Sequence, residues 1–330
     1  MRAVVIDGAG GPEVLHLRSV PDPVPGAEEL LVAVRASALN RADLLQRRGL
    51  YPAPPDAPPD VPGLEFAGTV SLCGERVRGW RPGDRVMGLL PGGGHAERVA
   101  VHERLCLAVP PALGWEEAAA IPEAFLTAYD ALFRQGELAA GEVVLLHAAA
   151  SGVGTAALQL AAVAGARVIA LSRTADKRAR LERLGAHRVL APDGADLIEA
   201  IRLAAGGSGV DLVLDMVGAP TWRGNLEVLR ECGRLVVIGL LGGATVELDL
   251  ARLMRRRLRL IGSVLRSRPV EQKIVLVQEF ARCVLPLFAA GRLRAIVDRA
   301  LPLERAAEAH ALLERNATFG KVVLTIGDGA

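Results

Sequence analysis

The sequence predicts an α/β protein with two domains, and three observations lead to this expectation. The chain has 330 residues, which is longer than one hydrophobic core usually supports. Up to about residue 120, short β-like runs are broken by Gly and Pro; after Pro122, apolar strands alternate with Ala- and Leu-rich helical stretches. The first pattern indicates a mostly antiparallel β domain, and the second indicates βαβ units on a doubly wound parallel sheet.

The first part of the chain contains short runs of strand-forming residues. They are Ala3 to Ile6, Glu29 to Ala38, Ala67 to Leu72, Arg85 to Leu90 and Ala96 to Val101. Between them, the segment from Tyr51 to Gly63 carries six prolines. Proline cannot sit in a central strand, so this segment is expected to form a stiff surface loop that could line a cleft.

The second part contains six strand candidates separated by helical stretches. They are Val143 to His147, Arg167 to Leu171, Arg188 to Leu190, Leu212 to Asp215, Arg234 to Ile238 and Leu258 to Gly262. Two helical segments follow, around Glu279 to Ala290 and Glu304 to Glu314, and then a strand, Lys321 to Ile326. Because the parallel sheet is complete by then, we expect the last strand to return to the first domain.

Composition excludes several classes of protein. Apolar residues make up 51% and charged residues 23%, as in a globular chain and unlike a disordered one. Basic and acidic residues number 39 and 37, and they are spread along the chain, so the overall charge does not indicate a nucleic-acid-binding protein. The one compact basic run, from Arg252 to Arg259, is interpreted as a solvated surface, with a nucleic-acid patch as the alternative.

Cysteine use and hydropathy suggest a cytoplasmic protein. No apolar run reaches the roughly 18 residues of a membrane span, and no leader-like pattern follows Met1. No two cysteines have the C-x-x-C spacing of a metal or redox site, and a reducing compartment fits them best. The cysteines are Cys73, Cys106, Cys232 and Cys283.

The most informative segment lies where a buried strand ends at His147 and a helix starts near Val153. Phosphate binding at such a junction needs little backbone bulk and free amide groups at the positive end of a helix. Ser151, Gly152, Val153 and Gly154 supply both. Ala148, Ser151 and Gly154 occupy the register of the G-x-G-x-x-G dinucleotide fingerprint. The alternative is an ordinary tight turn between strand and helix.

The end of the second parallel strand distinguishes the two nicotinamide coenzymes. Sites specific for NAD carry a carboxylate there, which bonds the ribose hydroxyls and would repel the additional phosphate of NADP. Here the place holds Ser172, Arg173 and Thr174, with Lys177 one helical turn later. A guanidinium, hydroxyls and an ammonium can bind that phosphate, so NADPH is the expected cofactor. The alternative is that Arg173 and Lys177 only face solvent.

Several stretches of the chain resemble a known family. The stretches that carry the likeness are NRADLLQRRGLYP, LPGGGHAERV, AAAIPEAFLTAYDAL, AAASGVGTAALQLA and GSVLRSR. Together they are similar to the zinc-free quinone oxidoreductase branch of the medium-chain dehydrogenase/reductase superfamily, and most of all to its stress-inducible, zeta-crystallin-related members.

The resemblance implies a GroES-like catalytic domain of residues 1–121 and 268–330, and a Rossmann NADP-binding domain of residues 122–267, with the active site in the cleft between them. It also implies a homodimer in which the edge strands near Leu258 to Val264 pair across a two-fold axis. Arginines flank that edge, which disfavours uncontrolled pairing but does not forbid a specific contact.

The resemblance predicts no metal site. A catalytic zinc needs about three Cys, His or acidic ligands and an open position. Where zinc-dependent relatives carry Cys and G-H-E, this chain has Asn40 and Gly63, Leu64 and Glu65. Without a metal the acceptor must already be electrophilic, as a quinone is, and the enzyme mainly has to hold donor and acceptor together.

The resemblance also nominates site residues. It places Asn40, Tyr51 and Thr127 near the nicotinamide, with Tyr51 acting as proton donor or only as an anchor. Asp43 could instead cap a helix or pair with Arg47. Second-tier cofactor contacts are expected after the fifth and sixth parallel strands, at Gly239, Leu240, Leu265, Arg266 and Ser267. By resemblance Asn316 reaches the cofactor, unless it only ends a helix. Pro192 stands where relatives often have a tyrosine, which weakens the case for NADP preference.

Two other functions stay open at this stage. An alkene reductase acting on enones or enoyl thioesters would use the same hydride chemistry on another conjugated acceptor. A binding role, in which NADPH occupancy regulates an RNA or a protein partner, would depend on the basic run from Arg252 to Arg259.

Overall fold

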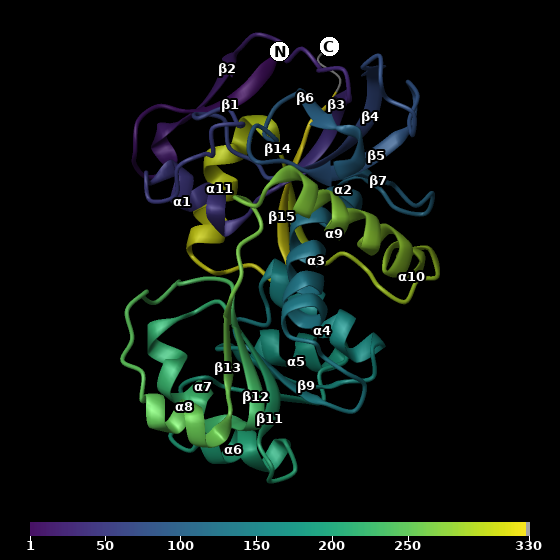
Figure 1. Ribbon diagram of the computed structural model, residues 1–330. Coiled ribbons are helices and arrows are strands. Elements are labelled where there is room, and N and C mark those ends of the chain that lie inside the picture. The colour runs from purple at the N-terminus through teal and green to yellow at the C-terminus, as the bar shows by residue number, and fades with distance from the viewer. Residues whose placement is uncertain (328–330) are drawn as a thin grey trace. The chain divides into compact units, whose positions relative to one another are not determined.

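The structure of this protein is a computed structural model that describes residues 1–327 (Figure 1). The chain divides into two compact units. Unit 1 comprises Met1–Leu126 and the residues from Leu265 onward, and unit 2 comprises Thr127–Val264. The sequence placed the boundaries at 121/122 and 267/268. The first division instead falls inside a helix, α3 (Pro122–Tyr129), where no loop-forming residue marks it.

Unit 1 is built on a mostly antiparallel sheet, as predicted. Its strand order is β14-β15-β3-β4-β5-β7, with β6 paired to β3, and a separate two-stranded sheet joins β1 to β2. The strands are β1 (Arg2–Ile6), β2 (Leu15–Ser19), β3 (Glu29–Ala38), β4 (Glu65–Cys73), β5 (Arg85–Leu89), β6 (Arg98–His102), β7 (Cys106–Ala108), β14 (Val297–Pro302) and β15 (Lys321–Thr325).

The last strand returns to the first domain, as the sequence indicated. β15 pairs antiparallel with β3, joining Val323 to Ala38 and Thr325 to Ala36. On its other side β15 pairs in parallel with β14, which the sequence did not reveal. Asp298 and Arg299 interrupt the apolar pattern of β14, because only part of this edge strand is buried.

The helices of unit 1 carry one correction to the sequence prediction. A helix was expected over Glu279 to Ala290, but α9 begins at Val270, directly after Pro269, and ends at Cys283. A separate short helix, α10, then contains Pro286 in its first turn, where the missing amide costs nothing. The helices of unit 1 are α1 (Arg41–Arg47), α2 (Trp115–Ala119), α9 (Val270–Cys283), α10 (Leu285–Ala289) and α11 (Ala306–Glu314), together with most of α3.

Unit 2 is a doubly wound parallel sheet, which confirms the predicted fold class. Its strand order is β10-β9-β8-β11-β12-β13, so the winding reverses between β8 and β11. The strands are β8 (Val143–Leu146), β9 (Arg167–Leu171), β10 (Arg188–Leu190), β11 (Val210–Asp215), β12 (Leu229–Val237) and β13 (Arg259–Gly262). Ligands of such sheets bind at the carboxyl ends of the strands, beside the point of reversal.

Helices cover both faces of this sheet, with α4 and α5 on one side and α7 and α8 on the other (Figure 1). The helices are α4 (Gly152–Val163), α5 (Ala175–Arg183), α6 (Leu197–Ala204), α7 (Trp222–Val228) and α8 (Leu250–Arg256). Short one-turn elements complete the two units: η1 (Pro12–Val14), η2 (Glu103–Leu105), η3 (Asp130–Gln135), η4 (Ala219–Thr221) and η5 (Leu303–Arg305). Between the layers lies an apolar core that includes Val143, Ile169, Val213 and Leu235.

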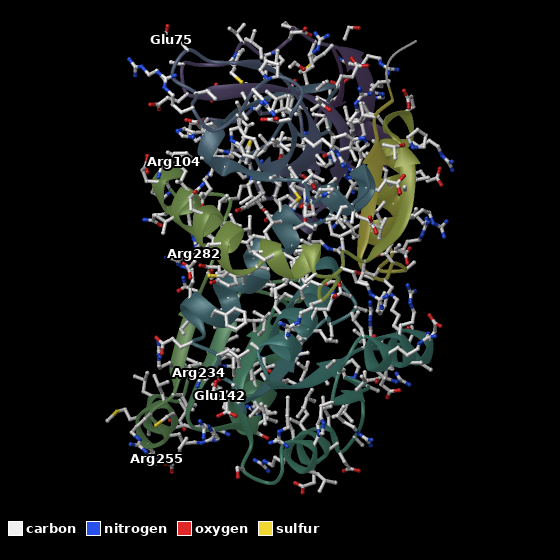
Figure 2. All side chains as sticks on the ribbon, turned by 90° about the vertical axis from the view of Figure 1, so that its right-hand side faces the viewer. Glu75, Arg104, Glu142, Arg234, Arg255 and Arg282 are labelled. Atoms are coloured by element: carbon white, nitrogen blue, oxygen red, sulfur yellow. The ribbon has the colours of Figure 1, made fainter. Side chains whose placement is uncertain are left out.

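A buried ion pair ties β12 to the turn before β8. Arg234 donates to both carboxylate oxygens of Glu142, at 2.8 and 2.5 Å, and to the carbonyl of Gly136. Figure 2 shows the two side chains of the pair next to each other. A bidentate arginine contact of this kind is strong because both hydrogen bonds are charge-assisted. The pair therefore joins the amino ends of β12 and β8, which lie on either side of β11, opposite the ligand edge of the sheet.

Within residues 1–327, none of the helices combines the length and the apolar character that crossing a lipid bilayer would require.

Candidate functional site

The first candidate site is the turn between β8 and α4 in unit 2. Ser151 is the N-cap of α4, and its hydroxyl accepts a hydrogen bond of 3.0 Å from the amide of Gly154. The first amides of a helix have no partner inside the helix, and the helix dipole makes this end positive. The backbone amides of Ser151, Gly152, Val153 and Gly154 therefore stand at a helix end that is suited to a phosphate group.

Gly154 is required by close packing at this turn. A Cβ atom on Gly154 would lie 2.6 Å from the carbonyl oxygen of Ala148 and 2.6 Å from the backbone of Ala149. Ala148 itself has φ +43°, in the left-handed region that L side chains avoid. The turn thus keeps the conformation of a glycine fingerprint although an alanine occupies its first position.

The second strand end, after β9, carries the residues predicted to select the coenzyme. Ser172 is buried, Arg173 is exposed and Lys177 is partly buried in the first turns of α5. Arg178, which the sequence reasoning missed, donates to the carbonyls of Ser172 and Arg173 at 3.2 and 2.6 Å. A guanidinium thus holds this loop in place and adds positive charge where NAD-specific sites carry a carboxylate.

Two further strand ends lie beside the turn from Ser151 to Gly154. The Ser151 hydroxyl contacts the sulfur of Met216, which follows β11, at 3.5 Å. A Cβ on Gly239, after β12, would lie 3.1 Å from the carbonyl oxygen of Met216. Leu240 is exposed next to it. Of the predicted cofactor contacts, Gly239 and Leu240 therefore stand at the same strand edge as Ser151.

A buried hydrogen-bond network supports this edge from behind. Asp215, fully buried at the end of β11, accepts from the Val217 amide, the Thr221 hydroxyl and the Asn225 side chain at 2.7, 2.7 and 2.8 Å. Asn225 in turn bonds His147 at 2.7 Å. Burial lowers the pKa of His147, so its ring is neutral and has a structural role.

The second candidate site is a buried charge cluster in unit 1 around Asn40. The Glu65 carboxylate, at the start of β4, lies 2.6 Å from the Lys321 ammonium of β15 and accepts a 2.9 Å hydrogen bond from the Asn40 amide. Lys321 also donates to the Asn40 side-chain oxygen at 2.6 Å. Burial raises the pKa of Glu65, while Lys321 and Asn40 oppose this effect. These three side chains form one interlocked group.

Asp43 caps a helix, which was one of the predicted alternatives, and does so in a fully buried position. Its carboxylate accepts from the Asn40 amide at 2.7 Å and from the Gly63 amide at 2.9 Å. It does not pair with Arg47, whose guanidinium reaches Glu314 instead. Asp43 thus fixes the backbone on both sides of Asn40 and is already satisfied.

Glu123 belongs to the same cluster and was missed in the sequence. Its amide donates to the second Glu65 oxygen at 2.7 Å. Burial, together with the negative charge of Glu65, raises the pKa of the Glu123 carboxyl to about 8. Glu123 is therefore mostly protonated at neutral pH and can donate a proton. An acidic residue inside the apolar run AAAIPEAFL was the available signal.

Tyr51 lies over a buried guanidinium. The Arg266 guanidinium carbon is 5.2 Å from the centre of the Tyr51 ring. Burial raises the pKa of Tyr51, so its hydroxyl stays protonated and can donate a hydrogen bond. The Arg266 side chain is bound within unit 1, to the Pro91 carbonyl and to Gln46, both at 2.7 Å.

The remaining predicted residues occupy separate places. Thr127 lies in α3, one turn after Glu123, and is the first residue of unit 2. Leu265 is buried and Ser267 exposed. Asn316 follows α11 with φ +54° and accepts a 2.6 Å hydrogen bond from Arg41. It therefore has the helix-ending position that the sequence left as an alternative to a cofactor contact.

The residues at the position of a catalytic zinc do not fit that ion. Zinc requires three good donors and an open position. Here the Glu65 carboxylate and the Asn40 oxygen are both bound by the Lys321 ammonium, and an asparagine stands where zinc-dependent relatives carry a cysteine. Among the residues that the structure describes, no group of three His, Cys, Asp or Glu side chains is arranged to hold a metal ion.

Comparisons with known proteins agree with both units. The family described as Alcohol dehydrogenase GroES-like domain matches residues 26–111, and the one described as Zinc-binding dehydrogenase matches residues 152–282. A curated quinone oxidoreductase of Lama guanicoe is 33% identical over 99% of this chain and 98% of the relative. A human quinone oxidoreductase is 31% identical over the same shares.

Solved structures extend this likeness to the whole fold. An Escherichia coli quinone oxidoreductase complexed with NADPH has a TM-score of 0.90 at 31% identity, covering 98% of this chain and 100% of that one. An NAD-dependent alcohol dehydrogenase has 0.89 at 36%, covering 99% and 100%. The CurK enoyl reductase has 0.88 at 28%, covering 99% of each. This chain therefore belongs to the quinone oxidoreductase branch of the medium-chain dehydrogenase/reductase superfamily, the zeta-crystallin-like oxidoreductases.

Proposed function

We propose that this chain reduces quinones with NADPH by hydride transfer and without a metal ion. The observation that carries the proposal is the phosphate-binding turn at Ser151 to Gly154 beside a β9 end that holds cations in place of a carboxylate. Relatives named quinone oxidoreductase, one of them solved with NADPH, support the same function.

The coenzyme preference depends on Arg173, Lys177 and the loop that Arg178 holds in place. A phosphate monoester on the ribose would gain charge-assisted hydrogen bonds from these groups. One similar solved structure is an NAD-dependent alcohol dehydrogenase, so NADH is the coenzyme to compare with NADPH. Pro192 has no polar side chain that could bind the phosphate. Ser172, Gly239, Leu240, Leu265, Ser267 and Asn316 remain proposed secondary contacts.

The acceptor side of the reaction requires one proton for each hydride. The bound nicotinamide supplies a hydride when it is present. The reduced acceptor then carries a negative oxygen, which takes a proton from Glu123 or Tyr51, and the donor regains a proton from water. We propose Asn40, Tyr51 and Thr127 as positioning residues and Glu123 as the stronger acid, because its pKa lies closer to neutrality.

Metal independence is supported by the charge cluster. The Lys321 ammonium already neutralises Glu65, so a divalent ion would have to displace a buried cation. We also propose a cytoplasmic location, for which the lack of paired cysteine spacing is the support.

A homodimer through β13 is the proposed assembly. β13 is one of the two edge strands of the unit 2 sheet, and an unpaired edge can add a strand from a second copy. Sedimentation velocity on the purified protein tests this, and a monomer at micromolar concentration would contradict it.

The experiment for the main proposal is a steady-state assay. Purified protein should oxidise NADPH in the presence of 1,4-benzoquinone and do so with a higher kcat/KM than with NADH. Chelation of metal ions beforehand should leave the rate unchanged. No oxidation of either coenzyme with any small quinone would contradict the proposal.

An alkene reductase is the second candidate, favoured by the likeness to the CurK enoyl reductase. It would use the same hydride and proton donors on a conjugated carbonyl. NADPH loss with an enone or an enoyl thioester, measured beside the quinone assay, separates the two acceptors.

A regulatory RNA-binding role has less support. In the basic run, Arg252 and Arg256 donate to the Leu226 carbonyl, and Arg257 pairs with Glu231. Arg259 pairs with Glu137. Guanidiniums engaged in this way are less free to contact phosphates. A gel-shift assay at low salt would have to show a shift that is lost on replacing these arginines.

A further inference from the structure

Unit 1 contains two buried cations, Arg266 and Lys273, that have no carboxylate partner within salt-bridge distance among residues 1–327. Arg266 is 6% exposed and Lys273 is 5% exposed. Arginine and lysine are rarely buried to this degree unless an anion pairs with them, since an unpaired buried charge is costly. We propose that Arg266 and Lys273 form a subsite that binds an acidic group, a carboxylate or sulfonate, carried by the conjugated acceptor. The inference builds on the proposed reductase function and defines its substrate class.

The Arg266 guanidinium is held in place and has one donor atom in reserve. Its Nε donates to the Pro91 carbonyl and one Nη to the Gln46 oxygen, both at 2.7 Å. The other, Nη1, is buried and has no hydrogen-bond partner among the described residues. A planar guanidinium with two donors fixed by the protein and a third unused is preorganised for an anionic oxygen.

The Lys273 ammonium is equally underused. It sits in the first turn of α9, and its only hydrogen bond among the described residues is a long one, 3.4 Å, to the Arg266 carbonyl. Burial lowers the pKa of Lys273 and that of Arg266, and the nearby carboxyl groups only partly oppose this. Both cations are therefore buried without a negative group that would compensate their charge.

The acidic groups that face these cations do not supply that charge. Asp56 is exposed in the proline-rich loop, and no ion pair joins it to either cation. Asp43 is occupied by two backbone amides. Glu123, whose pKa is about 8, is mostly neutral at pH 7. None of the three is a counter-ion within salt-bridge distance in the described chain.

Tyr51 gives the subsite its selectivity for flat molecules. Its ring lies 5.2 Å from the guanidinium carbon and covers the cation from one side. An acid group reaches Nη1 when this ring turns aside, and the ring can then stack on the conjugated part of the acceptor. The proline-rich segment that carries Tyr51 forms a loop with no helix or strand.

A binding experiment without catalysis tests the subsite first. Calorimetry should show 2-naphthalenesulfonate binding to the protein roughly tenfold to a hundredfold more tightly than the neutral 2-naphthalenesulfonamide. Arg266→Met and Lys273→Met should each lose this preference, and Arg266→Lys should keep part of it. The control is Arg282→Met, which removes an exposed charge from the same helix, α9 (Figure 2). Equal affinity for the two probes in the unchanged protein would overturn the proposal.

An activity ratio then separates this proposal from the reductase proposal. With NADPH, kcat/KM for 1,2-naphthoquinone-4-sulfonate relative to 1,2-naphthoquinone should fall roughly tenfold in Arg266→Met and not in Arg282→Met. An unchanged ratio would overturn the subsite. If neither quinone is reduced but the sulfonate still binds preferentially, the reductase function fails and the subsite stands.

Two measurements distinguish a subsite from a structural or coenzyme-binding role of the same cations. Lys273→Met should melt at the same temperature as the unchanged protein or higher, because it removes a buried charge with one weak hydrogen bond. A folded variant with intact sulfonate preference would overturn the assignment of Lys273. If Arg266→Met weakens NADPH binding and leaves sulfonate binding unchanged, the cation serves the coenzyme, and the subsite proposal is wrong.

Discussion

The two candidate sites differ in how their polar groups are satisfied. At the strand ends of unit 2, Asp215 and Asn225 form a buried hydrogen-bond network behind the backbone amides of the turn from Ser151 to Gly154. Unit 1 contains the buried ion pair of Glu65 with Lys321. It also contains two buried cations, Arg266 and Lys273, that have no carboxylate partner in the described chain. A site of backbone amides is complete in one short segment, whereas a site of buried charges needs residues from distant parts of the chain. Substitutions at four places in the chain test this contrast.

The largest effect is expected in unit 1. Lys321→Met leaves the Glu65 carboxylate buried without its countercharge, which should cost about 3–5 kcal/mol of unfolding free energy. Adding Glu65→Gln to the same chain should restore much of the loss. Urea denaturation of the parent, the single variant and the double variant measures this. A Lys321→Met variant as stable as the parent would show that the ion pair does not stabilise unit 1.

A smaller effect is expected at the cationic end of β9. Arg173→Glu combined with Lys177→Glu should reduce the difference in binding free energy that favours NADPH over NADH by about 1.5–3 kcal/mol. The reason is that repulsion replaces charge-assisted phosphate contacts. Fluorescence titration with both coenzymes gives the ratio. Arg180→Glu, on the same helix α5, controls for the change in charge. An unaltered ratio would remove the basis of the NADPH proposal.

The Glu123 carboxyl links the unit 1 site to pH. Its pKa rises from 4.5 to about 8 on folding, so the folded state holds the proton between these values and stability falls as pH rises through that window. Glu123→Gln should therefore gain roughly 1–3 kcal/mol relative to the parent between pH 5 and pH 9, a range scaled down because the residue is only partly covered.

The same variant should change the pH profile of the reaction. The parent kcat should decline above about pH 8 as Glu123 loses its proton, and Glu123→Gln should lack that decline. Matching profiles for parent and variant would assign the proton donor to another group, with Tyr51→Phe as the next variant to measure.

The smallest effect concerns backbone strain at the phosphate turn. Ala148 adopts φ +43°, and Ala148→Gly should relieve about 1 kcal/mol of left-handed strain, partly offset by the greater freedom of glycine in the unfolded chain. Thermal unfolding measures the sum. A clear loss of stability would mean that the methyl group packs better than the strain costs.

Features made by one short segment could be predicted from the sequence, and features made by distant residues could not. The order of strands and helices in unit 2, and the turn at Ser151 to Gly154, are local patterns of a few residues, and the structure has them where expected. The β14 strand was missed because two of its six residues are charged and most of the strand is not fully buried. Helix α9 was placed too late because its amino end begins after Pro269 without a capping residue.

The unit 1 cluster was beyond local patterns. Glu65 and Lys321 lie 256 positions apart in the chain and meet only because β15 joins the sheet beside β3. Glu123 looked like one acidic residue in an apolar run, and its pKa is raised first by burial in the fold and then by the charge of Glu65 from another element. The coenzyme contact expected of Arg266 from its strand position stays a prediction, and no sequence pattern indicated that its guanidinium binds Gln46.

The pairing of β15 with β3 also has a consequence for biosynthesis. Unit 2 is one continuous stretch and can fold as soon as Val264 has left the ribosome. The N-terminal strands emerge first but wait for the final residues to complete their sheet, and until then Glu65 has no ammonium beside it. The oldest part of the nascent chain is therefore the last to reach its native state, so a ribosome that stops shortly before Lys321 leaves a finished coenzyme unit attached to an unfinished partner.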